Sequence, residues 1–295
     1  MTNIYLFLIF MLPGTVFLGF YDVFTKKILS SNINERFLIA LDFCLVGILV
    51  LGVTAAFGLP EIKSGFWVAF SSTVFLNIFA IWFFTKAFQK EDVSLVSPIR
   101  LISPPLTLLT GFIILKENPS LYGIIGVLVT FFGLWILLNS TKKIKIFSFR
   151  EIRKHTGVLY AIAGSISFAI SLPFDKKATI TSSAPFLIGL GFFLIGFGNL
   201  VIGFILSKNK KDFFYIPKIV RKFLFPYIII HSIGAVLTMQ AINYSLAAYT
   251  SSVKRLWSFW AIIFSGAILK EKNIGKKLIA ALIMLAGIVL TVALG

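Results

Sequence analysis

The chain carries Ile113-Ile114-Leu115-Lys116-Glu117 in its first half and Ala267-Ile268-Leu269-Lys270-Glu271 in its second half. A shift of 154 residues places the first stretch on the second. The same shift places Arg100 on Lys254. These matches predict an internal duplication, which is the strongest sign of how the chain is organised.

Two further matches extend the duplication. Asn77 falls on His231 at the same shift of 154 residues. Near the start of each half, Phe24-Thr25-Lys26-Lys27 matches Phe174-Asp175-Lys176-Lys177 at a slightly smaller shift. The duplication therefore covers both halves from their first to their last segments.

The composition predicts a membrane protein. Hydrophobic residues make up 58% of the 295 residues, charged residues only 13%, and the mean hydropathy is +0.96. A soluble chain carries about 25% charged residues. Apolar runs of about 20 residues cross a bilayer as helices, which satisfy their own backbone in lipid. Ten such segments are expected, at roughly 4–24, 36–58, 66–86, 93–115, 120–139, 157–178, 184–206, 224–246, 247–269 and 276–294.

Five segments fall in each half, and an odd number forces the two halves to insert in opposite orientations. We therefore expect an all-α membrane protein of ten transmembrane helices, built as two inverted five-helix repeats. The first repeat spans 1–139, a basic linker spans 140–156, and the second repeat spans 157–295. The first segment lacks a preceding basic region, so we expect a retained helix and not a signal peptide. Inverted repeats place a transport site near the midplane, at the repeat interface.

Three basic residues, Arg100, Lys254 and Arg255, lie inside predicted spans. A cation at the centre of a membrane helix costs about 2.5–3.5 kcal/mol. These cations either line an aqueous cavity and meet an anionic substrate group, or they are paired or snorkelling structural residues. Helical spacing favours the cavity, because polar side chains share one stripe with Arg100 and another with Lys254 and Trp257. Trp257 either stacks on a planar substrate or packs.

Two interpretations are open for other polar residues in the predicted spans. Asp42 either pairs with an intramembrane cation or binds and releases a proton to couple transport. Asp22 and Asp175 lie near helix ends beside Lys26 and Lys176, and are expected to be terminal charges or, alternatively, to take part in gating. The third and eighth segments add four candidates, which either bond a neighbouring helix or face substrate: Asn77, His231, Gln240 and Tyr244.

The fourth segment contains Pro98, Pro104 and Pro105. Proline bends a membrane helix and frees backbone carbonyls. Such a break is tolerated where neighbours or a water-filled cavity satisfy the freed groups. The prolines therefore predict either a packing kink or a hinge at a binding site.

The chain resembles the drug/metabolite transporter superfamily in its ten-helix EamA-type form. The resemblance rests on Leu115–Glu117 and Leu269–Glu271, each followed by a glycine-containing apolar helix, and on Val93–Pro98 at the start of the fourth helix. It implies secondary transport, often export of amino acids, nucleobases or other metabolites. The Lys254-Arg255 pair is also similar to the basic pair with which sugar-phosphate antiporters of this superfamily hold phosphate.

No phosphate loop, metal-ligand cluster or nucleophile elbow is visible, so we expect no enzyme, no cofactor and no metal. We expect a secondary active transporter that moves a small polar metabolite by alternating access. An amino acid, an organic acid or a phosphorylated metabolite would supply an anionic group. The alternatives are a non-transporting membrane subunit and a lipid flippase.

The formal charge of +17 is attributed to topology signals and to contact with anionic lipid, not to a nucleic-acid partner. The expected partners are therefore the small-molecule substrate and membrane lipid. We expect a multi-pass monomer or homodimer in a bacterial cytoplasmic (inner) membrane. Its single cysteine, Cys44, allows no internal disulfide.

The loop charges predict an orientation that a fusion tests. With the N-terminus outside, 21 of the 28 basic residues fall in cytoplasmic loops and four in outer loops. The positive-inside rule therefore predicts both termini outside the cytoplasm, whereas the resemblance implies both inside. Alkaline phosphatase fused after Gly295 should be active, and green fluorescent protein fused there should stay dark. The opposite pair of results would reverse the orientation.

Overall fold

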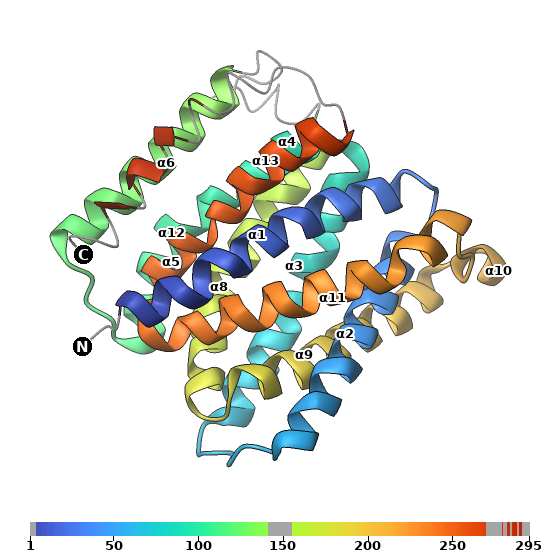
Figure 1. Ribbon diagram of the computed structural model, residues 1–295, viewed down its shortest axis with the longest axis horizontal. Helices are drawn as coiled ribbons and strands as arrows, with labels where there is room; N and C mark the ends of the chain where they lie inside the picture. The colour runs from blue at the N-terminus through green and yellow to red at the C-terminus, as the bar shows by residue number, and fades with distance from the viewer. Residues whose placement is uncertain are drawn as a thin grey trace.

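The computed structural model describes residues 4–140 and 155–269, together with 279, 282, 283, 285–287, 289 and 290. Every regular element within these residues is a helix (Figure 1). The first repeat contains α1 (Ile4–Leu29), α2 (Glu35–Phe57), α3 (Phe66–Lys90), α4 (Val93–Ile99), η1 (Arg100–Ile102), α5 (Ser103–Leu115) and α6 (Leu121–Ser140). The second contains α8 (Thr156–Ile180), α9 (Ala184–Leu206), α10 (Lys210–Phe213), α11 (Lys218–Ala241), η2 (Ile242–Tyr244), α12 (Ala247–Lys254) and α13 (Leu256–Leu269).

Six of the described helices are long and apolar enough to cross a membrane: α1, α2, α3, α8, α9 and the continuous run of α11 and η2. The fourth, fifth and ninth predicted segments coincide with shorter helices: α4 to α5, α6, and α12 to α13. Most of the predicted tenth segment, 276–294, and most of the linker, 140–156, lie outside the described residues. The chain is a multi-pass membrane protein.

Two segments are broken at equivalent places. In the first repeat a 3-10 turn begins at Arg100, between α4 and α5. In the second repeat α12 ends at Lys254 and α13 begins at Leu256. Pro104 and Pro105 account for the first break, because proline lacks the amide hydrogen and disfavours α geometry in the residue before it. The second break has no proline, and its turn is closed by a hydrogen bond from Arg255 N to Ser252 O at 3.0 Å.

The helix contacts obey a two-fold exchange of the repeats. In the duplication α1, α2 and α3 correspond to α8, α9 and α11. Packing of α3 on α8 is repeated as packing of α11 on α1, and packing of α1 on α13 is repeated as packing of α8 on α5. Two further contacts join a helix of one repeat to the equivalent helix of the other repeat: α2 packs on α9, and α5 packs on α12. The two halves are therefore intertwined, with every long helix touching the other repeat (Figure 1).

The Leu-Lys-Glu stretch of the first repeat ties three helices together. Lys116 adopts a left-handed backbone, with φ 57°, that ends α5 and turns Glu117 inward. Glu117 accepts hydrogen bonds from Lys176 Nζ at 2.5 Å and from Ala247 N at 2.9 Å. Lys176 also donates to Ser245 O at 2.8 Å. This tie explains the motif physically, since it anchors the end of α5 to α8 and to the start of α12.

Lys26 makes the corresponding contact in the other half. Its ammonium donates to Glu91 O at 2.8 Å, and Glu91 falls on Ser245 in the duplication. It also donates to Phe88 O at 2.7 Å. Equivalent lysines thus close equivalent helix ends. Glu271, the counterpart of Glu117, lies outside the described residues.

Glycine brings α2 and α9 into backbone contact. A Cβ added at Gly47 would lie 2.5 Å from Phe193 N, and one added at Gly196 would lie 2.6 Å from Cys44 N. Lipid supplies little drive for helix association, so such close approach holds membrane helices together. Gly189, also on α9, makes the same kind of contact, since an added Cβ there would lie 2.8 Å from Leu51 N.

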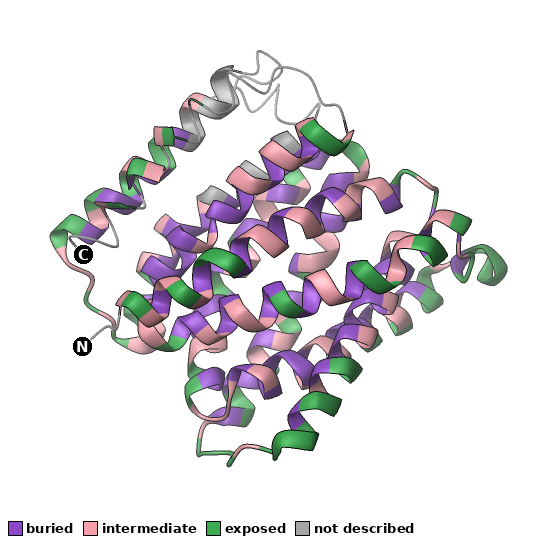
Figure 2. Cartoon of the chain, in the orientation of Figure 1, coloured by how far each residue is buried: buried purple, intermediate pink, exposed green. Residues whose placement is uncertain are grey.

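Large apolar side chains remain exposed on the outer faces of the bundle (Figure 2). Phe75 is 64% exposed and Ile113 is 65% exposed. A water-soluble protein rarely exposes wide apolar surface. These faces meet lipid, whereas the buried residues follow the lines along which the helices touch (Figure 2).

Gly47→Ala and Gly52→Ala form a matched pair on α2. The new methyl group at position 47 would strike the α9 backbone, whereas at position 52 nothing lies within 4 Å. We expect Gly47→Ala to lower the melting temperature of the purified protein. Gly52→Ala should leave it unchanged or raise it, because alanine favours a helix over glycine. Equal melting temperatures would contradict the close α2–α9 contact.

Candidate functional site

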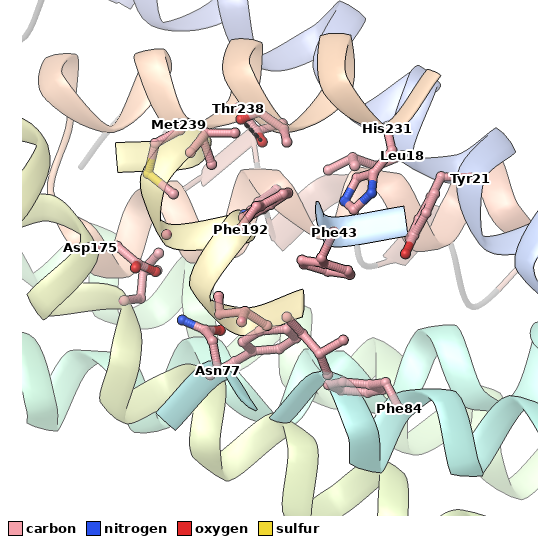
Figure 3. Close-up of a pocket in the computed structure, with 18 of the residues that line it drawn as sticks. Leu18, Tyr21, Phe43, Asn77, Phe84, Asp175, Phe192, His231, Thr238 and Met239 are labelled. Carbon is pink, nitrogen blue, oxygen red and sulfur yellow. Dashed lines mark hydrogen bonds between the residues drawn. The ribbon is translucent and has the colours of Figure 1, made fainter. Parts of the chain in front are cut away.

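A cavity of about 1090 Å³ lies between the two repeats (Figure 3). Its walls come from α1, α2, α3, η1, α8, α9, α11, α12 and α13 and from Arg255. Six of the residues singled out in the sequence line it: Asn77, Arg100, His231, Lys254, Arg255 and Trp257. Arg100 and Lys254 stand at the two helix breaks, and both line this cavity. The prolines therefore lie beside a helix break at the cavity, which favours the interpretation as a hinge at a binding site over a packing kink.

Two other predicted residues are not among those lining the cavity. Tyr244 stacks against Phe10 with a centroid separation of 5.9 Å, so it packs η2 on α1. Gln240 stands at the end of α11 and is half-buried. The structure does not bring either residue to the cavity with the other six.

Arg100 is neutralised by a carboxylate. Its Nη1 lies 2.5 Å from Asp22 Oδ2, and Trp257 Nε1 donates to the same oxygen at 2.5 Å. The guanidinium also lies 4.0 Å from the centroid of the Trp257 ring. Asp22 is fully buried, so its interpretation as a helix-end charge is wrong. This cluster joins α1, η1 and α13, which is the pairing that a buried arginine in lipid needs.

Lys254 and Arg255 differ from Arg100. Both line the cavity, yet within the described part of the chain neither has an ion-pair partner or a side-chain hydrogen bond. Arg255 is only 6% exposed, and its Nε is buried without an acceptor. A buried cation without a counter-ion is costly. The arrangement leaves two positive groups available to an anion in the cavity.

Asp175 brings a negative charge to the same cavity. Its carboxylate accepts hydrogen bonds from Thr73 and, at 3.3 Å, from Ser171. Asn77 donates to Ser171 Oγ at 2.8 Å and completes this polar group (Figure 3). Asp175 stands in the last two turns of α8, as expected, but its carboxylate also lines the cavity. The duplication held the signal that would have found it: Asp175 falls on Thr25, which also lines the cavity.

Asp42 and His231 meet across the repeats. His231 Nδ1 lies 2.9 Å from Asp42 Oδ2, and the Tyr21 hydroxyl donates to the same oxygen at 2.7 Å. His231 and Tyr21 line the cavity, while Asp42 is fully buried behind them. The partner of Asp42 in the structure is thus a histidine and a tyrosine, and not one of the basic residues.

The remaining walls are apolar and rich in phenylalanine. Phe43, Phe84, Phe168 and Phe192 all line the cavity. Phe192 lies between Asp175 and His231 in Figure 3. Aromatic walls with a few placed polar groups are typical of small-molecule sites. Gly191 also lines the cavity, and there an added Cβ would first meet Phe70 at 3.7 Å. That glycine widens the space and does not join helices.

The comparisons with known proteins agree with this architecture. No curated protein matches the sequence. A solved structure, described as "Crystal structure of protein", has a TM-score of 0.68 and 14% identity, and the match covers 95% of this chain and 96% of the other. At that identity the likeness concerns the fold alone. The model of the "EamA-like transporter family" matches residues 5–139 and again residues 155–293. The two matched stretches coincide with the two repeats, and the chain belongs to the EamA-like transporter family.

Proposed function

We propose that this member of the EamA family is a secondary active transporter for a small metabolite that carries an anionic group. The carrying observation is the pair Lys254 and Arg255, two cations that line the cavity and make no salt bridge or side-chain hydrogen bond to the described residues. A carboxylate or phosphate would supply the missing partner. Amino acids, organic acids and phosphorylated metabolites all fit this description.

The rest of the cavity supports a substrate with both polar and apolar parts. Its phenylalanine walls offer surface to an apolar or planar portion, and Trp257 already packs on Arg100 and is less available for stacking. Asp175 and Asn77 offer a second polar contact away from His231 (Figure 3). A substrate held between these groups would be positioned at more than one point.

The mechanism we propose is alternating access between two inverted repeats of five spans each. The two-fold exchange of helix contacts supports it, because equivalent halves allow two conformations of similar energy. The broken helices support it as well, since discontinuous helices surround the sites of such transporters. The membrane we propose is the bacterial cytoplasmic membrane.

A non-transporting subunit and a lipid flippase fit less well. A structural subunit needs no unpaired cations inside the bundle, because each would destabilise it without benefit. A flippase needs a polar groove that opens sideways to lipid. The cations here lie in a cavity that residues of both repeats line.

Lys254→Ala and Arg255→Ala test the anion site. Each change removes a positive charge from the cavity wall while leaving the helix contacts in place, so transport should be lost while expression and melting temperature are kept. A metabolite panel screened by thermal shift on the purified protein supplies the substrate, since a ligand of the folded state raises the melting temperature. Uptake into proteoliposomes then measures transport. Lys177→Ala, at an exposed lysine of α8, is the control. Normal transport by both cavity variants would exclude the pair from the site.

Asp22→Asn tests the structural role assigned to Arg100. The change leaves the Arg100 guanidinium buried without a counter-charge, and breaking a buried pair costs about 3–5 kcal/mol. We therefore expect a large fall in melting temperature and in yield. Glu61→Gln, at an exposed acid between α2 and α3, should behave as wild type. A stable Asp22→Asn protein would show that the pair does not hold α1 to η1.

A further inference from the structure

The contact between His231 and Asp42 fixes which nitrogen of the imidazole carries hydrogen. Asp42 Oδ2 lies 2.9 Å from His231 Nδ1 and accepts a hydrogen bond from the Tyr21 hydroxyl at 2.7 Å. An ionised carboxylate accepts hydrogen bonds and cannot donate them. With Asp42 ionised, the hydrogen in the contact belongs to Nδ1. In the neutral ring Nε2 then carries the lone pair.

Nε2 is placed to take up a proton from the cavity. The His231 ring lines the cavity, and Asp42 lies behind it with no exposed surface. In the part of the chain that the structure describes, Nδ1 is the only ring nitrogen with a hydrogen-bond partner. The carboxylate behind the ring stabilises the imidazolium that forms on protonation. The pair is thus a proton acceptor that opens on the same space as the anion site.

Aromatic rings surround the imidazole on three sides. Tyr21 stacks on it with a centroid separation of 3.9 Å, and the centroids of Phe43 and Phe192 lie 5.0 and 5.1 Å from it (Figure 3). Ring faces attract a cation through their quadrupole. The pair has little exposed surface, with His231 4% and Asp42 0% exposed, and His231 lines the cavity.

The fixed charges of the cavity balance when His231 is neutral. Among the described residues, the charged side chains that line the cavity, or bond to a side chain that lines it, are three cations and three carboxylates: Arg100, Lys254 and Arg255, and Asp22, Asp42 and Asp175. A monoanionic substrate would leave this buried group one negative charge in excess. A buried net charge is expensive in a membrane protein. One proton on His231 restores the balance.

We propose that His231 Nε2 is a proton-binding site that carries one proton together with each monoanionic substrate. A hydronium ion in the cavity gives its proton to Nε2, so an N–H bond forms, an O–H bond breaks and a water molecule remains. Nδ1 keeps its hydrogen bond to Asp42, and the charge of the pair changes from −1 to zero. The inference rests on the proposed function for the charge of the substrate, but proton binding itself needs no substrate.

Several groups act on His231 from the elements around it. The nearest are Tyr21 on α1 and Asp42 on α2, with Phe43 and Phe192 beside the ring. On its own helix Tyr227 bonds Thr25 at 2.9 Å and stacks on Tyr21 at 5.0 Å. Across the cavity stand the charged residues named above, with Arg100 already paired to Asp22. The proton site is therefore separate from the two unpaired cations but shares their cavity.

The chain has only two histidines, His155 and His231, so proton binding can be read directly. In full-length His155→Gln protein labelled with carbon-13 at histidine Cε1, a single imidazole signal remains. We expect the chemical shift of this signal to change with pH, because Nε2 gains its proton. In the Asp42→Asn background the midpoint should move about 1 to 3 pH units lower, because the opposite charge is lost. A signal that does not change with pH, or a midpoint that Asp42→Asn leaves in place, would overturn the proton site.

Removing a positive charge from the cavity changes its net charge by the same amount as binding a monoanion. Lys254→Gln or Arg255→Gln makes the cavity one unit more negative, so each should move the midpoint to higher pH. Lys177→Gln removes an exposed charge at the end of α8 and should leave it unchanged. Melting temperatures identify any variant that has lost its fold, and the second cation variant then decides. A midpoint that neither cation variant moves would overturn the coupling of proton and anion.

These results separate the inference from the proposed function. If a metabolite is transported but the His231 signal does not titrate, the proton site is wrong and the transporter stands. If the signal titrates as described but none of the metabolite panel binds or crosses, the transport proposal fails and the His231 site remains. His231→Gln should abolish proton movement that accompanies uptake, measured with pyranine inside the proteoliposomes.

Discussion

Lipid cannot solvate a charge, and this constraint arranges the whole interior of the protein. The buried charges that the structure describes in the core gather at the seam between the repeats, where protein groups or a cavity take the place of water. Arg100 has Asp22 and an indole, and His231 has Asp42. Lys254 and Arg255 have only the cavity. The distinction between paired and unpaired cations divides the seam into a structural part and a part open to a ligand.

Much of the fold could be predicted from the sequence, because lipid imposes simple rules. Span lengths follow from bilayer thickness, and nine predicted segments correspond to described helices or pairs of broken helices. The duplication can be recognised because Glu117 and the lysines of α1 and α8 have counterparts in the other half. In the structure Lys26 and Lys176 bind groups at the ends of neighbouring helices. The ten-span count and the inversion rest on sequence arithmetic and helix contacts together.

The site was only partly predictable, for a physical reason. Helical spacing identifies which residues share a face, and it brought Arg100, Lys254 and Trp257 to the cavity correctly. It cannot show which charge neutralises which, because that depends on helices far apart in the sequence. Spacing alone therefore places Asp22 and Asp175 near helix ends, whereas the structure buries Asp22 and brings Asp175 to the cavity wall. Tyr244 was a candidate by polarity alone, and a ring of α1 covers it.

The glycine seam between α2 and α9 has a consequence for movement. Each of these helices is the counterpart of the other, so their contact lies on the pseudo-two-fold axis. If the two related halves exchange conformations, atoms near the pseudo-two-fold axis move least, and the parts farther from the axis rotate about them. Backbones in contact, as at Gly47 and Gly196, leave no side chain to rearrange during such a turn. In the proposed alternating-access cycle the seam would therefore be the pivot, and the broken helices on either side would move about it.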